Sequence, residues 1–333
     1  MKCLKVPKSK GEEVRKILLR RSLVSNEHKI RSENGYLLLP LITDEVDLDY
    51  PVVERDMEEL ELPPSSLSDI IELPPGFETE LPSSYDIVGD IILLKISDNL
   101  EPHKKKLGEA LLKLHKNVKV VLEDRGVEGE LRIRDVVHLA GEERTRTVHR
   151  EHGAEYVVDL SKAYFSPRLA TERWRVVRRV RPGERILDMF TGVGPYSILI
   201  AKNTKVEKVY AVDLNPEAVS LLDENVRRNK VEDIIETVQG DVRDVKVKAD
   251  RIIMNLPHSA RNFLPHALKS LDSKGYIHYY EVMPIDGMGS LEEELKSTIK
   301  HLGFSAKIIE VREVRTYSAS KVHAAVDIKA CLG

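Results

Sequence analysis

Short apolar runs alternate with amphipathic stretches from residue 165 to about residue 303, and this alternation limits the possible folds more than any other feature. Parallel strands need a crossover connection, usually a helix, so the pattern predicts a mostly parallel sheet. Two further apolar runs, at residues 305–314 and 323–330, follow with no helical stretch between them. We therefore predict an α/β fold, a Rossmann-type domain whose sheet ends in a C-terminal antiparallel hairpin.

Four successive predicted strands of this domain end at polar residues. The first strand leads through Asp188 into a turn that contains Gly192 and Gly194, and the next three end at Asp213, Asp241 and Asn255. Ligands of open α/β sheets bind at the carboxyl ends of the strands, so we predict a binding site there. The glycines allow a tight turn and a close approach of the ligand to the backbone.

The first turn favours one cofactor over another. A dinucleotide-binding turn reads Gly-x-Gly-x-x-Gly, whereas Ser197 stands at the third glycine position. S-adenosylmethionine has no phosphates, and its ammonium and sulfonium groups suit carboxylates such as Asp188. Asp213 would accept hydrogen bonds from the ribose hydroxyls, and Asp241 one from the adenine amino group. Leu214 and Val242, which follow these two acids, complete the predicted cofactor site.

Composition divides the chain in front of this domain into three blocks. Residues 1–62 predict a small N-terminal α/β module with a hairpin turn at Asn34-Gly35. Residues 63–84 are acidic and proline-rich, which is typical of a linker. Residues 85–164 predict a middle α+β domain with single strands at 87–96 and 130–140, and the Rossmann-type domain fills 165–333.

Bulk properties exclude several classes of protein. The net charge of −3 gives no support to nucleic-acid binding, so any basic surface would have to be local. The two cysteines have no metal-binding or redox spacing, and we predict no metal site. The sequence has no apolar leader and no apolar run long enough to cross a membrane, so we expect a cytoplasmic protein.

The loop Asn255-Leu256-Pro257-His258 resembles the Asn-Pro-Pro-aromatic loop of methyltransferases that act on nitrogen, with two positions changed. An asparagine there could hold the edge of a target base. It could equally cap the following helix.

Together with this loop, several segments resemble the archaeal and eukaryotic tRNA (guanine-N1) methyltransferases, which modify guanosine 37 of tRNA. These segments are residues 129–134, 138–145, 164–169, 171–173, 188–195 and 255–257. They come from two predicted domains in a fixed order, and the resemblance extends from about residue 85 to the C-terminus. It implies a class I, S-adenosylmethionine-dependent enzyme that works as a monomer, without a protein partner, on the anticodon loop and elbow of a folded tRNA.

The resemblance also implies roles for individual residues. Glu172 matches the proposed general base, Arg132 the arginine that stabilises charge on the guanine, and Asn255 the residue that holds the base. Arg173, Asp213 and Asp241 match cofactor-binding positions. These residue types suit the chemistry, because guanine N1 carries a proton that a base must remove while negative charge develops on O6. The base must also be unstacked to enter a pocket.

The same residues have simpler interpretations, and other functions remain open. An Asp after a strand is often a turn or capping residue, Glu172 would favour the first turn of any helix, and Arg132 would alternate with Arg134 on a solvated strand. Basic clusters at 104–106, 144–150 and 173–181 are either solvated faces or phosphate contacts. Alternatives are methylation of another RNA base, a small molecule or a wyosine-pathway intermediate, and a non-catalytic RNA-binding protein.

Overall fold

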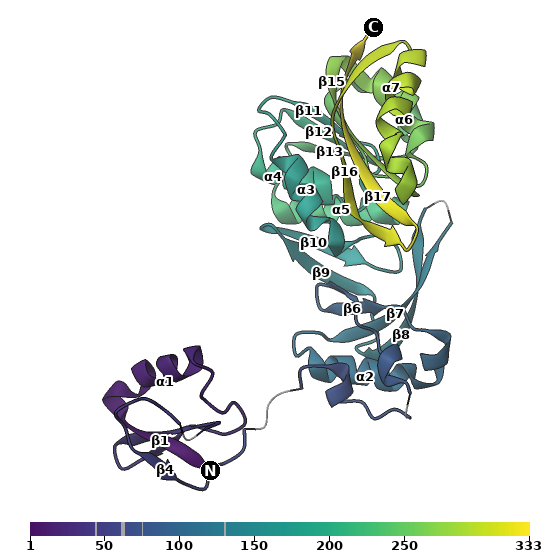
Figure 1. Ribbon diagram of the computed structural model, residues 1–333. Coiled ribbons are helices and arrows are strands. Elements are labelled where there is room, and N and C mark those ends of the chain that lie inside the picture. Colours follow the sequence, from purple (N-terminus) through teal and green to yellow (C-terminus); the bar gives the residue numbers. More distant parts are fainter. Residues whose placement is uncertain (44, 61–63, 75, 130) are drawn as a thin grey trace. The chain divides into compact units, whose positions relative to one another are not determined.

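The computed structural model describes residues 1–333 apart from 44, 61–63, 75 and 130. The chain forms two compact units, Met1–Asp69 and Ile70–Gly333 (Figure 1). The predicted boundary between residues 62 and 63 lies outside the described residues.

The smaller unit is a sheet with one helix packed on it. Its strands are β1 (Lys2–Pro7), β2 (Arg31–Glu33), β3 (Tyr36–Pro40) and β4 (Val52–Glu54), and they pair antiparallel in the order β2-β3-β1-β4. Helix α1 (Gly11–Arg20) buries Val14 and Leu18 in the same small core as Leu4 and Leu39. Asn34 and Gly35 both have positive φ angles, as the predicted hairpin turn requires.

The larger unit contains the predicted Rossmann-type sheet, with strand order β13-β12-β11-β14-β15-β17-β16. Strands β11 (Arg185–Asp188), β12 (Lys208–Asp213), β13 (Ile235–Gln239), β14 (Ala249–Met254) and β15 (Leu271–Pro284) run parallel. Strands β16 (Phe304–Ser318) and β17 (Lys321–Leu332) form the antiparallel hairpin at the edge. The predicted fold class and hairpin are therefore confirmed.

Helices cover both faces of this sheet (Figure 1). One face buries α3 (Ala170–Val177), α4 (Pro195–Asn203) and α5 (Pro216–Asn229), and the other buries α6 (Ala260–Ser270) and α7 (Leu291–His301). Helices α5, α6 and α7 bury apolar residues at three- and four-residue spacing, whereas α4 is buried at six consecutive positions, Tyr196–Ala201.

The middle part of the chain packs into the same unit. Strands β5 (Asp86–Val88), β6 (Ile91–Leu94), β7 (Val120–Glu128) and β8 (Ile133–Gly141) form one sheet, on which α2 (Lys104–Leu114) packs. Strands β9 (Arg146–Glu151) and β10 (Ala154–Asp159) form a second, two-stranded sheet. The Asn225 amide of α5 exchanges two hydrogen bonds with the Val157 backbone of β10, at 2.6 and 3.0 Å. One apolar core therefore runs from β6 and β7 through β10 into the Rossmann-type sheet.

One strand prediction in the middle part is wrong, and a second is confirmed from Ile133 onward. The single strand at 87–96 is a hairpin, because Gly89 turns the chain at φ +58° between β5 and β6. A Cβ at Gly89 would lie 2.2 Å from Thr147 Oγ1, so only glycine fits this contact. The strand predicted at 130–140 begins at Ile133. Arg132 precedes it in the left-handed region at φ +54°, so Arg132 and Arg134 do not alternate on one strand.

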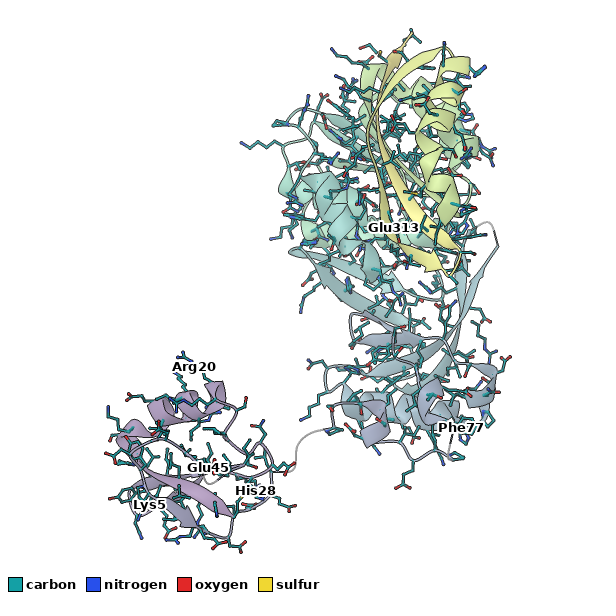
Figure 2. All side chains as sticks on the ribbon, viewed as in Figure 1. Lys5, Arg20, His28, Glu45, Phe77 and Glu313 are labelled. Atoms are coloured by element: carbon teal, nitrogen blue, oxygen red, sulfur yellow. The ribbon has the colours of Figure 1, made fainter. Side chains whose placement is uncertain are left out.

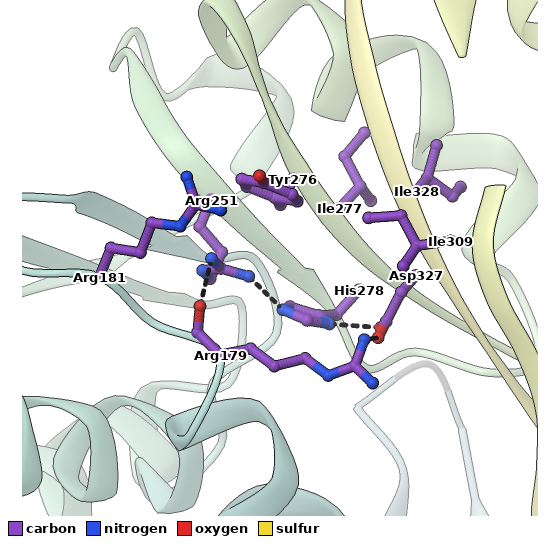
Figure 3. A pocket seen from close by; sticks show the side chains of 9 residues that line it. All are labelled: Arg179, Arg181, Arg251, Tyr276, Ile277, His278, Ile309, Asp327 and Ile328. Carbon is purple, nitrogen blue, oxygen red and sulfur yellow. Dashed lines mark hydrogen bonds and ion pairs between the residues drawn. The ribbon is translucent and has the colours of Figure 1, made fainter. Parts of the chain in front are cut away.

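A network of buried charges ties the end of α3 to the sheet (Figure 3). The Arg251 guanidinium donates to His278 Nε2 at 2.8 Å, and His278 Nδ1 lies 2.6 Å from Asp327 Oδ1. Because an arginine can only donate, His278 Nε2 must accept, so the neutral ring carries its proton on Nδ1. Arg175 and Arg179 also donate to Asp327. All of these residues except Arg175 line a cavity, but their charges are satisfied by one another, so the network has a structural role.

Replacing Asp327 with alanine is expected to lower the free energy of unfolding of the larger unit by about 3–5 kcal/mol, because the buried His278 loses its partner and the half-buried Arg175 loses one of its two main partners. Urea unfolding at neutral pH measures this loss. The matched control is Glu310→Ala, which removes a partly exposed carboxylate from the same arginines and should cost less than about 1 kcal/mol. Equal losses in the two variants would contradict the structural role of the network.

The effect of Asp327 should also depend on pH. Burial raises the pKa of Asp327, but the hydrogen bonds and charges of His278 and Arg175 outweigh burial and hold it well below its ordinary value of 3.8. The stability from ionised Asp327 is therefore complete above pH 3.8 and is lost as the pH falls toward the lower folded pKa. The stability difference between wild type and Asp327→Ala should shrink over that acid range.

Candidate active site

A cavity of about 360 Å³ lies at the carboxyl ends of the parallel strands. Asp213 after β12, Asp241 after β13 and Asn255 after β14 all line it, as does Gly192 in the turn after β11. Residues separated by more than sixty positions in the sequence therefore meet in one place. This is the arrangement expected of parallel strands that end at a common edge.

The turn after β11 is held in shape by Asp213. Its Oδ2 accepts a hydrogen bond from the Gly192 N–H at 2.6 Å, and its Oδ1 accepts one from the Asn215 N–H at 2.9 Å. Burial raises the pKa of Asp213. Gly194 has a φ of +89°, and a Cβ there would lie 2.4 Å from a Leu222 methyl group, so this position requires glycine.

Asp188 lies beneath this turn and does not line the cavity. Its side chain is 1% exposed, and Ser197 Oγ donates to its Oδ2 at 2.8 Å. Burial raises its pKa to about 6. Ser197, which stands where a dinucleotide-binding turn has its third glycine, therefore serves to hold Asp188. A direct contact between Asp188 and a cofactor stays a prediction.

Apolar side chains and the carboxylates of Asp213 and Asp241 line the cavity. Leu214 is 42% exposed, and Phe190 contacts Phe263 edge-to-face with ring centroids 4.9 Å apart. Asp241 and Val242 also line the cavity, and Asp241 pairs with Arg243. Apolar side chains together with two carboxylates suit the adenosine of S-adenosylmethionine. No sequence pattern marks Phe263, because it lies on α6 and reaches the cavity only through the fold.

Arg173 lines the cavity but is already paired. Its side chain is buried, its guanidinium forms an ion pair with Glu151, and it donates to the Ser166 carbonyl oxygen at 3.2 Å. A contact between Arg173 and the cofactor therefore stays a prediction. The geometry gives it at least one other task, which is to join α3 to β9.

Arg132 and Asn255 also line the cavity. The Arg132 guanidinium lies over the Tyr164 ring at 5.2 Å from its centroid. Asn255 does not cap α6, because Ser259 occupies that position. No hydrogen bond within the described part of the chain uses the Asn255 side chain, so its amide can bind a ligand. His258 completes this wall, and its Nε2 lies 3.2 Å from the Tyr317 hydroxyl.

Glu172 lies behind the wall rather than on it. Its side chain is buried and accepts hydrogen bonds from Arg175 at 2.9 Å, from the Tyr280 hydroxyl at 2.6 Å and from Arg312. Burial opposes ionisation of Glu172, but the hydrogen bonds and charges of Arg175, Tyr280 and Arg312 outweigh burial and lower its pKa. The carboxylate is therefore ionised at neutral pH and lies one residue from the cavity, since the Tyr280 ring contacts His323 of the wall.

Three family models match the chain. Residues 147–312 match the TRM5/TYW2 methyltransferase domain, residues 66–145 the TYW2 N-terminal domain, and residues 3–49 the tRNA methyltransferase 5 N-terminal domain. The tRNA (guanine(37)-N(1))-methyltransferase Trm5b of Pyrococcus abyssi is 40% identical over 328 residues, which cover 98% of both chains. This chain belongs to the TRM5/TYW2 family.

Solved structures of the family distinguish two groups of relatives. The complex of aTrm5 with tRNALeu matches with a TM-score of 0.82 and 38% identity, covering 98% of this chain and 99% of that one. TYW2 of Methanocaldococcus jannaschii in complex with AdoMet matches with a TM-score of 0.60 and 28% identity. That match covers 100% of the TYW2 chain but only 75% of this one. About a quarter of this chain thus has no counterpart in that TYW2, whereas the Trm5 relatives span it.

Most of the predicted basic clusters are neutralised in this TRM5/TYW2-family fold. Arg144 pairs with Asp90, Arg146 with Glu224 and Arg150 with Glu155. Lys104 likewise pairs with Glu101. The arginines of the 144–150 cluster therefore form an ion-paired surface.

Sequence reasoning missed the contribution of the C-terminal hairpin to the site. Arg312 contacts Glu172, and Arg315, Tyr317 and His323 line the cavity. The hairpin was predicted only as an edge of the sheet, and strand periodicity does not reveal which end of a strand reaches an active site. Among the described residues, no group of His, Cys, Asp or Glu could hold a metal ion, and no helix is long and apolar enough to cross a membrane.

Proposed function

We propose that this chain transfers the methyl group of S-adenosylmethionine to N1 of the guanosine at position 37 of tRNA, 3′ to the anticodon. The observation that carries the proposal is a single cavity lined both by the strand-end residues Gly192, Asp213 and Asp241 and by Arg132 and Asn255. Its support is end-to-end similarity to Trm5b, together with the match of the N-terminal unit to the tRNA methyltransferase 5 model. S-adenosylmethionine supplies an electrophilic methyl group when bound.

The residues of the chain account for the remaining chemistry. The Asn255 amide holds the edge of the unstacked guanine in the cavity. Glu172 accepts the N1 proton, and Arg132 stabilises the negative charge that develops on O6. To reach guanine N1, the Glu172 carboxylate breaks its contact with Arg312 and forms one with the base. Loss of that cation raises the basicity of Glu172 when the proton is transferred.

The partner is tRNA, and we propose that the two units divide its recognition. The cavity of the larger unit takes the anticodon loop, and the smaller unit contacts the elbow. The smaller unit has its own core, so it can present a surface independently of the catalytic unit. All the catalytic residues that we assign come from one chain, so we propose a monomeric enzyme acting in the cytoplasm.

Replacing Asp213 with alanine is expected to weaken S-adenosylmethionine binding by roughly 10- to 100-fold, since a hydrogen bond to a charged group contributes about 1.5–3 kcal/mol. The variant loses the ribose contact and also the hydrogen bond that shapes the Gly192 turn. Isothermal titration calorimetry measures the dissociation constant directly. An unchanged constant in a folded Asp213→Ala protein would remove Asp213 from the cofactor site.

Nucleoside analysis of the product tests the function. The enzyme is incubated with methyl-labelled S-adenosylmethionine and either a full-length tRNA transcript or its isolated anticodon stem-loop. We expect label in 1-methylguanosine, with much faster transfer to the full-length tRNA because the stem-loop lacks the elbow. An unmodified transcript contains no wyosine intermediate, so absence of label despite donor binding would favour the wyosine-pathway or non-catalytic alternatives. Label in another nucleoside would change the target base.

A further inference from the structure

Strand β16 is bulged where it reaches the cavity. Its register against β17 shifts between Glu313 and Arg315 and again between Thr316 and Ser318, which leaves Tyr317 as the extra residue of the second bulge. Glu313 marks this stretch of the hairpin in Figure 2. Bulges change the direction of side chains and are frequent beside active sites. Here both Arg315 and Tyr317 line the cavity that contains Arg132.

Arg315 and His323 face each other across the hairpin as direct register partners. Both line the cavity, and the His323 side chain is 3% exposed. Arg315 Nε and His323 Nε2 are buried without a hydrogen-bond partner among the described residues. Two buried unpaired atoms on adjacent strands destabilise a fold unless a ligand meets them. They therefore indicate a polar ligand at this end of the cavity.

The charges around these two residues suit an anion. Arg132 and Arg315 both border this part of the cavity, and the acid behind it, Glu172, is neutralised by Arg175 and Arg312. Burial and the charge of Arg315 lower the pKa of His323 to about 4. His323 is therefore neutral at physiological pH and presents one N–H and one lone pair. A fixed cation beside a neutral donor is a suitable receptor for a phosphate oxygen.

We propose that Arg315 and His323 form a phosphate-binding subsite, in which Arg315 neutralises and His323 hydrogen-bonds a phosphate adjoining the nucleotide whose base is methylated. The proposal rests on the proposed function, because an unstacked nucleotide brings its own phosphates toward the pocket. Together with Asn255 and Arg132, the subsite holds the nucleotide at both its base and its backbone. The hairpin thus favours a guanine that is part of an RNA chain, with its phosphates, over a free guanine base.

The first test is the Arg315→Ala variant in single-turnover methyl transfer at increasing tRNA and salt concentrations. We expect its apparent tRNA dissociation constant to rise by roughly 10- to 100-fold. When the logarithm of this dissociation constant is plotted against the logarithm of salt concentration, the slope for Arg315→Ala should be smaller than that of wild type by about one. Binding of S-adenosylmethionine should not change. The matched control is Lys307→Ala, which removes an exposed cation near the start of the same strand and should leave these values unaltered.

The second test locates the phosphate. Two tRNAs are prepared, each with one neutral methylphosphonate linkage, on the 5′ side of nucleotide 37 in one and on the 3′ side in the other. We expect the wild-type enzyme to bind one of these two tRNAs weakly. Arg315→Ala should show no further loss at that position, because the two changes remove the same interaction. His323→Gln, which keeps an N–H at the position of Nε2, should bind better than His323→Leu. Inorganic phosphate should compete with tRNA only weakly, since the source is the RNA backbone.

The outcomes separate the subsite from the function. If the wild-type enzyme methylates guanosine 37 but Arg315→Ala keeps the wild-type tRNA affinity and salt slope, the subsite proposal is wrong and the proposed function stands. Additive losses from Arg315→Ala and the neutral linkage would also overturn it. Failure of wild type to form 1-methylguanosine would overturn the proposed function, whatever the variants do.

Discussion

Replacing Glu172 with glutamine is expected to slow single-turnover methyl transfer by roughly 10²–10⁴-fold, the usual contribution of a general base. Glutamine keeps the shape of the side chain and can still accept the hydrogen bond from Tyr280, but it cannot take the N1 proton. Donor and tRNA dissociation constants should stay close to those of wild type, because Glu172 does not line the cavity. Rapid quench with saturating enzyme measures the chemical step alone.

The control for this variant is Glu310→Gln. Glu310 pairs with Arg175 and Arg179, beside Glu172, but it is partly exposed and does not contact Tyr280. Its loss should leave the rate unchanged, which separates proton transfer from general disturbance of the arginine cluster. Wild-type single-turnover activity in Glu172→Gln would show that another group removes the proton.

Replacing Arg132 with alanine is expected to slow the chemical step by about 10²–10³-fold, as the loss of one donor to a developing oxyanion does elsewhere. Arg132 lies in a turn at φ +54°, over the Tyr164 ring, and its guanidinium borders the same space as the Asn255 amide. We expect a lower rate at saturating tRNA with donor binding unchanged. Arg132→Lys should recover only part of the rate, because lysine retains the charge but lacks the planar donor group.

Arg125→Ala is the matched control for Arg132. Arg125 is a partly exposed cation on β7, the strand that leads toward this turn, and it pairs with Glu123. Its removal tests whether loss of any positive charge in this region slows the reaction. Equal losses for Arg125→Ala and Arg132→Ala would indicate general attraction of RNA and would contradict a contact with O6.

Much of the fold follows from local pattern. Strands β11 to β15 are apolar runs separated by amphipathic helices, and the absence of a helix after residue 304 is enough to predict the hairpin. The pattern failed at Gly89, where an apolar run that predicts one strand contains a turn. Glycine is required in this turn because Thr147 lies close to it. That contact joins residues 58 positions apart, and no local signal records it.

The position of the cavity was predictable where strand ends line it. Asp213, Asp241 and Asn255 follow from the rule that parallel strands end at one edge, and they line the cavity. The environment of Glu172 could not be predicted, since Arg312 lies 140 residues away in the sequence. Arg315 and His323 escaped notice for a different reason, because only the register and bulges of the hairpin place both at the cavity.

Methyl transfer from labelled S-adenosylmethionine to two tRNA transcripts that differ only at position 37 tests the central claim most directly. One transcript has guanosine at this position and the other has adenosine. The account predicts label only in the guanosine transcript, released on digestion as 1-methylguanosine. Equal label in both transcripts, or none in either, would contradict it.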